Sequence, residues 1–453
     1  MIWTREQAKG LIDRVLALSR ADETVAVLTG GDRGNLRFAR NTATTSGATS
    51  GYSLAITATF GKRSGTVTTA EFDDASLSRA VRSAEEIARL SPENPEAMPA
   101  LAPQTYEPSN AFFEDVAAAT PEWRAKSAAA AVESSKQRGV ISAGFVETAA
   151  TIQALGNLKG LFGFDRATTV DYNLTARTPD GSGSGWASKS YNELRLLDPA
   201  RVATAAIEKA AQSKTPAAIE PGKYTVVLEP AAVADLLAIM IVYSADARQA
   251  DEGRSVFSKK GGGNRIGEQV FGENVQIYSD LQHPLAPTVA FDNEGLPIRR
   301  GAWVEKGVLK DLSHSRFWAQ KQGKQPTAGP LNLIMDGGAA TMEDLISGTE
   351  RGVLVTRFWY IRSLDPQTLL LTGLTRDGLF LIEKGKVTRA VKNMRWNDSP
   401  IVALNNIDAL SAAERVVSGE GFGGSAYGGA RVSIVCPAAR IREFTFSSAS
   451  DAV

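Results

Sequence analysis

Residues 23–69 decide the fold, and they read ETVAVLTGGDRGNLRFARNTATTSGATSGYSLAITATFGKRSGTVTT. The segment is rich in β-branched and aromatic residues, and glycine-containing turns such as GGDRGN and FGK interrupt it. This pattern predicts four short antiparallel strands, which we place at residues 24–28, 35–42, 51–60 and 63–69.

A helix is predicted on each side of these strands. Thr4 and Gln7 have the spacing of a capping box, and apolar residues at helical spacing follow them, so residues 4–20 should form an amphipathic helix. Asp74 opens the second helix, and a proline-rich linker at residues 91–103 follows it. Residues 1–103 are therefore predicted to form one α+β unit with an antiparallel sheet.

A similar order of elements recurs in residues 104–214. Thr120 is the expected N-cap of a helix with proline at its first position, and Asp198 opens a closing helix. Between these helices, β-prone stretches lie at residues 140–148, 151–163 and 167–177. The tripeptide Gly-Asn-Leu also occurs in both units, at residues 34–36 and 156–158. These features favour an internal duplication, although chance can supply a three-residue identity.

A C-terminal domain is expected at residues 215–453, after a second proline-containing joint. It begins with a strand at residues 223–228 and a largely apolar helix from Pro230. The later strands alternate in hairpin fashion, and we place their turns at EKG (305–307), RDG (376–378) and EKGK (383–386). The predicted fold class is α+β, with an N-terminal α/β region built on an antiparallel sheet and a β-rich C-terminal domain.

Composition limits the classes of partner. The 453 residues contain 50 Lys and Arg against 50 Asp and Glu, which gives a formal net charge of zero. Such a chain has no long-range field that would attract nucleic acid or an anionic membrane, so we expect neither as a partner. No apolar run approaches the roughly 20 residues of a spanning helix, and the N-terminus lacks the apolar core of a signal peptide. We therefore expect a cytoplasmic protein.

The chain has few cysteine or histidine side chains that could bind a metal. They are one cysteine, Cys436, and two histidines, His283 and His314. No two histidines lie one helical turn apart with a glutamate between them, as in hydrolytic zinc sites. A triad built from Asp311, His314 and either Ser313 or Ser315 is disfavoured, because neighbours in an extended segment point to opposite faces and no nucleophile elbow surrounds either serine. We assign no catalytic residue and no metal ligand to this chain.

The segment VAFDNEGLPIRRG (289–301) contains the most suggestive polar cluster. Asp292 and Glu294 lie two residues apart and would share one face of an extended chain, where they could bind a cation or the amino end of a peptide. The alternative is a polar turn closed by Gly295. A weaker hypothesis combines both carboxylates with His314 around an adventitious metal, as an independent hydrolase.

Three segments resemble the TldD/PmbA family, whose members are also described as modulators of DNA gyrase. They are FDNEGLPIRRGAWVEKGVLKDLSHS (291–315), GPLNLIMDGG (329–338) and CPAARIREFTFSS (436–448), and GNLRFARN (34–41) fits the N-terminal strand of the family. The resemblance runs over nearly the whole chain. In this family a TldD-type subunit with a His-Glu-x-x-x-His zinc motif pairs with a TldE (PmbA) type subunit that lacks it. Here PAAVADLLAI (230–239) stands in place of the motif and contains neither histidine nor glutamate, so the chain is similar to the TldE branch.

The resemblance implies a cytoplasmic metalloprotease that cleaves unfolded or extended peptides, in which this chain is the non-zinc subunit of a heterodimer. Zinc is expected in the TldD-type partner, no cofactor is expected in this chain, and the chain should be inactive alone. It would shape the cavity and hold substrate, with Asp292, Glu294, Gly295 and Tyr427 as candidate substrate-binding residues. The alternative is a stand-alone homodimeric peptide-binding or scaffold protein without protease activity.

Overall fold

One six-stranded antiparallel sheet contains all the strands of the first 214 residues. The computed structural model describes residues 2–417 and 432–450. The strands lie in the order β3-β2-β1-β4-β5-β6. The elements of this region are α1 (Arg5–Leu18), β1 (Glu23–Ala39), β2 (Thr42–Phe60), β3 (Arg63–Thr69), α2 (Asp74–Leu90), α3 (Glu114–Ala117), α4 (Pro121–Gln137), β4 (Ile141–Asn157), β5 (Phe162–Arg177), β6 (Ser184–Tyr191), a 3₁₀ turn (Leu194–Leu196) and α5 (Pro199–Gln212).

The two halves of this sheet have a similar order of elements: a helix, three strands and a second helix, with the short helix α3 and a 3₁₀ turn added in the second half. They join through the antiparallel pairing of β1 with β4, so the two units share one sheet. The internal duplication itself stays a prediction. The Gly-Asn-Leu tripeptide has no part in it, because Asn35 lies within β1 whereas Asn157 ends β4 and pairs with Val25.

The strands are longer and fewer than the local pattern predicts, and the predicted break at GGDRGN is wrong. β1 runs straight through this segment, with Gly30 at φ 155° and Gly31 at φ 149°. β2 and β4 pair with β1 on both sides, so ladder hydrogen bonds outweigh the local preference for a turn. The glycines are required because the chains approach closely here: a Cβ on Gly31 would lie 2.0 Å from the Ala150 carbonyl oxygen.

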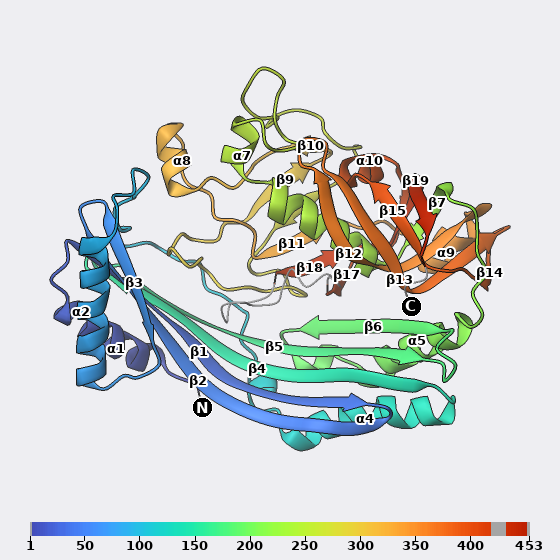
Figure 1. Ribbon diagram of the computed structural model, residues 1–453, viewed down its shortest axis with the longest axis horizontal. Coiled ribbons are helices and arrows are strands. Elements are labelled where there is room, and N and C mark those ends of the chain that lie inside the picture. The colour runs from blue at the N-terminus through green and yellow to red at the C-terminus, as the bar shows by residue number, and fades with distance from the viewer. Residues whose placement is uncertain (1, 418–431, 451–453) are drawn as a thin grey trace.

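The sheet has two differently covered faces. Its helices pack on one face, where Leu28 and Leu54 contact the cluster of α1 and α2, and Leu36 contacts the cluster of α4 and α5. On the opposite face, Val27 packs against a cluster that includes Phe291 of the C-terminal domain. Figure 1 shows the long strands curving around the C-terminal domain, with the helices on the outside.

The C-terminal domain is rich in strands, as predicted. Its elements are β7 (Gly222–Leu228), α6 (Pro230–Ala238), a π-helical turn (Ile239–Tyr243), α7 (Ala247–Asp251), β8 (Ile277–Ser279), β9 (Gly301–Glu305), β10 (Val308–Leu309), α8 (Arg316–Lys321), β11 (Asn332–Met335), α9 (Met342–Ser347), β12 (Arg351–Asp365), β13 (Leu370–Glu383), β14 (Lys386–Ala390), β15 (Met394–Asp398), α10 (Pro400–Asn405), β16 (Ile407–Leu410), β17 (Glu414–Val416), β18 (Ser433–Cys436) and β19 (Ala439–Ala449). They form one sheet in the order β10-β9-β8-β11-β18-β17 and a second in the order β12-β7-β19-β15-β13-β14, with β16 paired to β19.

Helix α6 lies in the core of this domain. Its residues from Ala232 to Ala238 are all buried, and they share one apolar cluster with strands of both sheets. Burial on all sides explains why the helix is almost entirely apolar. Among the described residues, no helix combines the length and the apolar character needed to cross a membrane.

The hairpin turns of this domain were predicted with mixed success. EKG joins β9 to β10 with Lys306 and Gly307 at positive φ, and EKGK joins β13 to β14. The predicted turn at RDG is wrong, because Asp377 (φ 56°) and Gly378 (φ 126°) lie inside β13, opposite a shift in the pairing register with β12. Positive φ there makes a bulge instead of a chain reversal.

Candidate functional site

The turn at Asp292–Gly295 lies against the inner face of the N-terminal sheet. Asp292 Oδ1 accepts hydrogen bonds from the backbone N–H groups of Glu294 and Leu296, both at 2.9 Å, as in a polar turn. Gly295 has φ 87°, which favours glycine at this position. Burial raises the pKa of Asp292, while the backbone N–H groups act in the opposite direction. Asp292 and Gly295 thus shape the turn, and the Glu294 side chain is exposed at its tip.

Contacts from the segment before α3 and from the sheet hold this turn in place. Tyr106 donates its hydroxyl to the Gly295 carbonyl oxygen at 2.9 Å, and its ring lies 4.8 Å from that of Phe291. Gln153 of β4 donates to the side chain of Asn293 at 3.3 Å. Partial burial raises the pKa of Tyr106 to about 12, so the hydroxyl keeps its proton at neutral pH. Three distant segments therefore meet at the turn.

A cavity of about 720 Å³ opens beside this turn. Its walls come from β1, β2, the end of β3, Thr151 of β4 and Asn293 of the turn. Most of the described lining residues are small, and Arg33 is the one charged residue among those that the structure describes. Such a wall offers backbone groups and hydroxyls, and these bind a peptide main chain with little dependence on side-chain identity.

Asp165 of β5 fixes the segment that precedes the turn. Its Oδ2 accepts a 2.7 Å hydrogen bond from the backbone N–H of Ala290, and burial raises its pKa above the ordinary value. The folded protein therefore binds this proton more tightly than the unfolded chain. Asp165 therefore stabilises the fold less as the pH rises from its pKa in the unfolded chain to its higher pKa in the folded protein. Above both pKa values the carboxylate is charged and buried, and the full cost of burying that charge is present.

Replacing Asp165 with asparagine should remove this pH dependence, because the amide keeps an acceptor oxygen and carries no charge. The free energy of unfolding of Asp165→Asn, relative to the wild type, should increase as the pH rises above the ordinary aspartate pKa and through the raised pKa of the folded state. Urea titrations at several pH values would measure this difference, with Asp13→Asn on the exposed face of α1 as the control. A relative stability that is flat or falls with pH would contradict the assignment.

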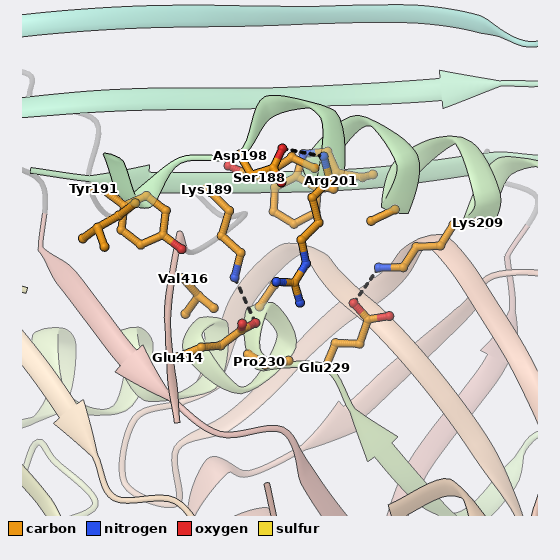
Figure 2. A pocket seen from close by; sticks show the side chains of 16 residues that line it. Ser188, Lys189, Tyr191, Asp198, Arg201, Lys209, Glu229, Pro230, Glu414 and Val416 are labelled. Carbon is orange, nitrogen blue, oxygen red and sulfur yellow. Dashed lines mark hydrogen bonds and ion pairs between the residues drawn. The ribbon is translucent and has the colours of Figure 1, made fainter. Parts of the chain in front are cut away.

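A second cleft, of about 280 Å³, lies where β6 and α5 meet the start of α6 and β17 (Figure 2). Two ion pairs cross this boundary, Lys189–Glu414 at 3.0 Å and Lys209–Glu229 at 2.6 Å. Figure 2 shows the guanidinium of Arg201 projecting between them. The pairs tie the second unit to the C-terminal domain.

The described residues supply no metal-binding group of three or more His, Cys, Asp or Glu side chains. Cys436 is fully buried, its Sγ lies 3.2 Å from the Pro230 carbonyl oxygen, and burial raises its pKa, so it is a structural thiol. His314 is 3% exposed, and its Nδ1 lies 2.8 Å from the Leu312 carbonyl oxygen. Burial lowers the pKa of His283, whose Nδ1 accepts from the backbone N–H of Leu285.

The sequence-based triad does not form. Ser313 Oγ donates to the Ala245 carbonyl oxygen, and Ser315 caps α8 by accepting from Trp318 N–H. Tyr427, the fourth candidate for substrate binding, lies outside the described residues. The sequence analysis missed Tyr106, Asp165 and the ion pairs of the second cleft, because their partners are far away in the chain and leave no periodic signal.

Comparison with known proteins gives a consistent result. Residues 221–448 match the PmbA/TldA metallopeptidase C-terminal domain, and residues 107–214 match the central domain of the same family. Relatives include an uncharacterized protein of Methanocaldococcus jannaschii, 33% identical over 33% of this chain and 38% of its own length. A metalloprotease of Synechocystis is 22% identical over 60% of this chain and 61% of its own length. The alignments thus span less than two thirds of these relatives.

Solved structures share the fold over almost the full length. TldE from Thermococcus kodakarensis superposes with a TM-score of 0.83 at 18% identity, covering 97% of this chain and 99% of that one. A protein from Bacteroides thetaiotaomicron, described as a modulator of DNA gyrase, superposes with a TM-score of 0.84 at 19% identity, covering 99% and 100%. At these identities the likeness establishes the fold alone.

Proposed function

Because this chain belongs to the PmbA/TldD metallopeptidase family, we propose that it is the non-zinc subunit of a two-subunit peptidase that acts on unfolded or extended peptides. The partner is a TldD-type subunit that binds zinc. When bound there, the metal supplies an activated water for peptide hydrolysis. The chain described here shapes the cavity and holds the substrate.

Helix α6 carries this proposal. From the resemblance of its sequence we infer that α6 stands where the TldD branch has its His-Glu-x-x-x-His motif. Its buried positions hold alanine, valine and leucine with a single carboxylate, Asp235. One carboxylate in an apolar helix is no donor set for zinc, which prefers three protein ligands in catalytic sites. The residues present therefore do not fit the metal, and we derive no chemical step through it in this chain.

The 720 Å³ cavity supports the substrate-holding role. Its walls are strands, and the residues that line it are mainly threonine, serine, glycine and alanine. The turn at Asp292–Gly295 contributes Asn293 to the lining. An extended peptide can bind there through its main chain. Glu294, whose exposed carboxylate lies 4.0 Å from Arg316 Nη1, follows the cavity-lining Asn293 and is our candidate for pairing with a peptide amino group. The alternative role, a stand-alone homodimeric peptide-binding protein, uses the same cavity without a partner.

A peptidase assay with separated and combined subunits tests this role. We expect no turnover of an unfolded peptide by the purified chain, and at least 100-fold more turnover after mixing with a TldD-type subunit from the same genome. Zinc analysis should find about one zinc per pair, and glutamine in place of the partner's motif glutamate should abolish turnover. Chelator-sensitive turnover by this chain alone would overturn the proposal, and peptide binding without any association with a TldD-type subunit would favour the stand-alone role.

A further inference from the structure

The cleft of about 280 Å³ where β6 and α5 meet α6 and β17 contains an arginine without a partner. Arg201 lies in the first turn of α5, and Figure 2 shows its guanidinium projecting away from the helix into the cleft. Its backbone N–H donates to Asp198 Oδ1 at 3.0 Å, but within residues 2–417 and 432–450 no hydrogen bond or ion pair reaches the guanidinium. The N–H groups of this guanidinium are therefore free to donate to a ligand.

Ion pairs on both sides of Arg201 already neutralise the other cations of the cleft. Lys189 Nζ lies 3.0 Å from Glu414, and Lys209 Nζ lies 2.6 Å from Glu229. Each carboxylate can accept more hydrogen bonds than its one lysine supplies. The side chain of Glu414 is 50% exposed, so it can also accept from a ligand, whereas that of Glu229 is 19% exposed. The cleft thus offers one free cation and, a short way from it, an accessible carboxylate.

The sum of the charges indicates the class of ligand. The described residues that line the cleft include three cationic ones and three anionic ones, so their formal charge is zero: Lys189, Arg201 and Lys209 against Asp198, Glu229 and Glu414. A dianion such as phosphate would leave an excess of negative charge beside two glutamates, and an unbalanced charge in a partly buried site is costly. A zwitterion carries one charge of each sign and leaves the cleft neutral.

The other walls of the cleft are largely apolar. Trp186 and Tyr191 line it from β6, Val202 lines it from α5, and Pro230 and Val416 line it from the C-terminal domain. Its volume of about 280 Å³ is just below the usual range of about 300–1,000 Å³ for ligand sites, so the ligand must be small. These walls favour a zwitterion that also carries an apolar group.

We propose that this cleft binds a free amino acid or a dipeptide with an apolar side chain. The guanidinium of Arg201 donates to the carboxylate of the ligand in the two-bonded way that suits this group. Glu414 accepts from the ammonium group, and the apolar side chain lies against Trp186 and Val202. The described residues of this cleft and of the 720 Å³ cavity do not overlap, so the proposal stands or falls separately from the peptidase role.

Calorimetric titration of the full chain with leucine and with Leu-Leu tests the site. We expect saturable binding, and the tighter of the two ligands shows whether the cleft takes an amino acid or a dipeptide. Arg201→Gln should raise the dissociation constant at least about tenfold, because a charge-assisted pair is lost. Arg201→Lys keeps the charge without the planar fork, so it should lose less. Arg82→Gln, at an exposed arginine on α2, is the matched control and should bind as the wild type does.

Blocked forms of the tighter ligand test its two charges on the wild-type protein, so this arm does not depend on the folding of a variant. The amide lacks the carboxylate and the N-acetyl form lacks the ammonium group, and each should bind at least about fivefold more weakly. Four results would each overturn the proposal. They are no saturation by either ligand up to about 10 mM, equal binding of a blocked form, tighter binding of inorganic phosphate, and a loss on Arg33→Gln in the larger cavity without a loss on Arg201→Gln.

Discussion

Replacing Asp377 with alanine should lower the free energy of unfolding by about 3–5 kcal/mol. Asp377 is 1% exposed, and its Oδ2 accepts from Nε of Arg357 at 2.9 Å and from Nη2 of the same guanidinium. Its Oδ1 accepts from the hydroxyl of Ser184 at 2.5 Å. The variant leaves the charge of Arg357 buried without its partner, and such an uncompensated charge is the costly case.

The position of this ion pair adds to the expected effect. The Arg357 guanidinium lies 4.5 Å from the ring centre of Trp186 on β6 and 5.3 Å from that of Trp359 on β12. It therefore stacks between the N-terminal sheet and the C-terminal domain. Asp377 also has φ 56°, which aspartate and asparagine tolerate better than alanine.

Chemical denaturation followed by circular dichroism would measure the loss. Asp377→Asn keeps the shape, the backbone conformation and an acceptor for Ser184, so it should lose less than Asp377→Ala. Asp13→Ala, in an exposed pair with Lys9, is the matched control and should cost at most about 0.5 kcal/mol. A loss below about 1 kcal/mol for Asp377→Ala would show that the pair does not hold the two regions together.

The local elements of this fold could be predicted from sequence, because each depends on residues close in the chain. The capping box of Thr4 and Gln7 starts α1, Thr120 caps α4, and Asp198 caps α5 where expected. The failures at GGDRGN and RDG have one cause. Glycine and aspartate favour turns locally, but pairing with neighbouring strands keeps GGDRGN within β1 and limits RDG to a bulge inside β13.

The candidate site was predictable only in part for the same reason. The cluster Asp292, Glu294 and Gly295 stood out because its residues are close together in the sequence, and of this turn only Asn293 is among the described residues that line the cavity. The residues that hold it, Tyr106 and Asp165, lie 189 and 125 positions from their partners. Contacts at such separations leave no spacing that a single sequence can reveal.

Arg415 on β17 should be the second most sensitive position, and Arg415→Ala should cost about 2–4 kcal/mol. Its side chain is 3% exposed and donates through Nη1 to the Leu285 carbonyl oxygen at 2.7 Å and to Asn192 Oδ1 at 3.3 Å. Alanine would leave both acceptors without this donor and would create a cavity between β17 and the N-terminal sheet.

Burying this charge costs free energy, and a second variant can measure that cost. Desolvation lowers the pKa of Arg415 to about 10, the direction expected when the charged form is disfavoured. Methionine fills a similar volume without a charge, so Arg415→Met should lose less than Arg415→Ala, although the two acceptors still lack a donor. If both variants lose the same stability, the loss comes mainly from the donated hydrogen bonds and not from the packed volume of the side chain. If neither variant loses more than about 1 kcal/mol, β17 is not held to the sheet through this side chain.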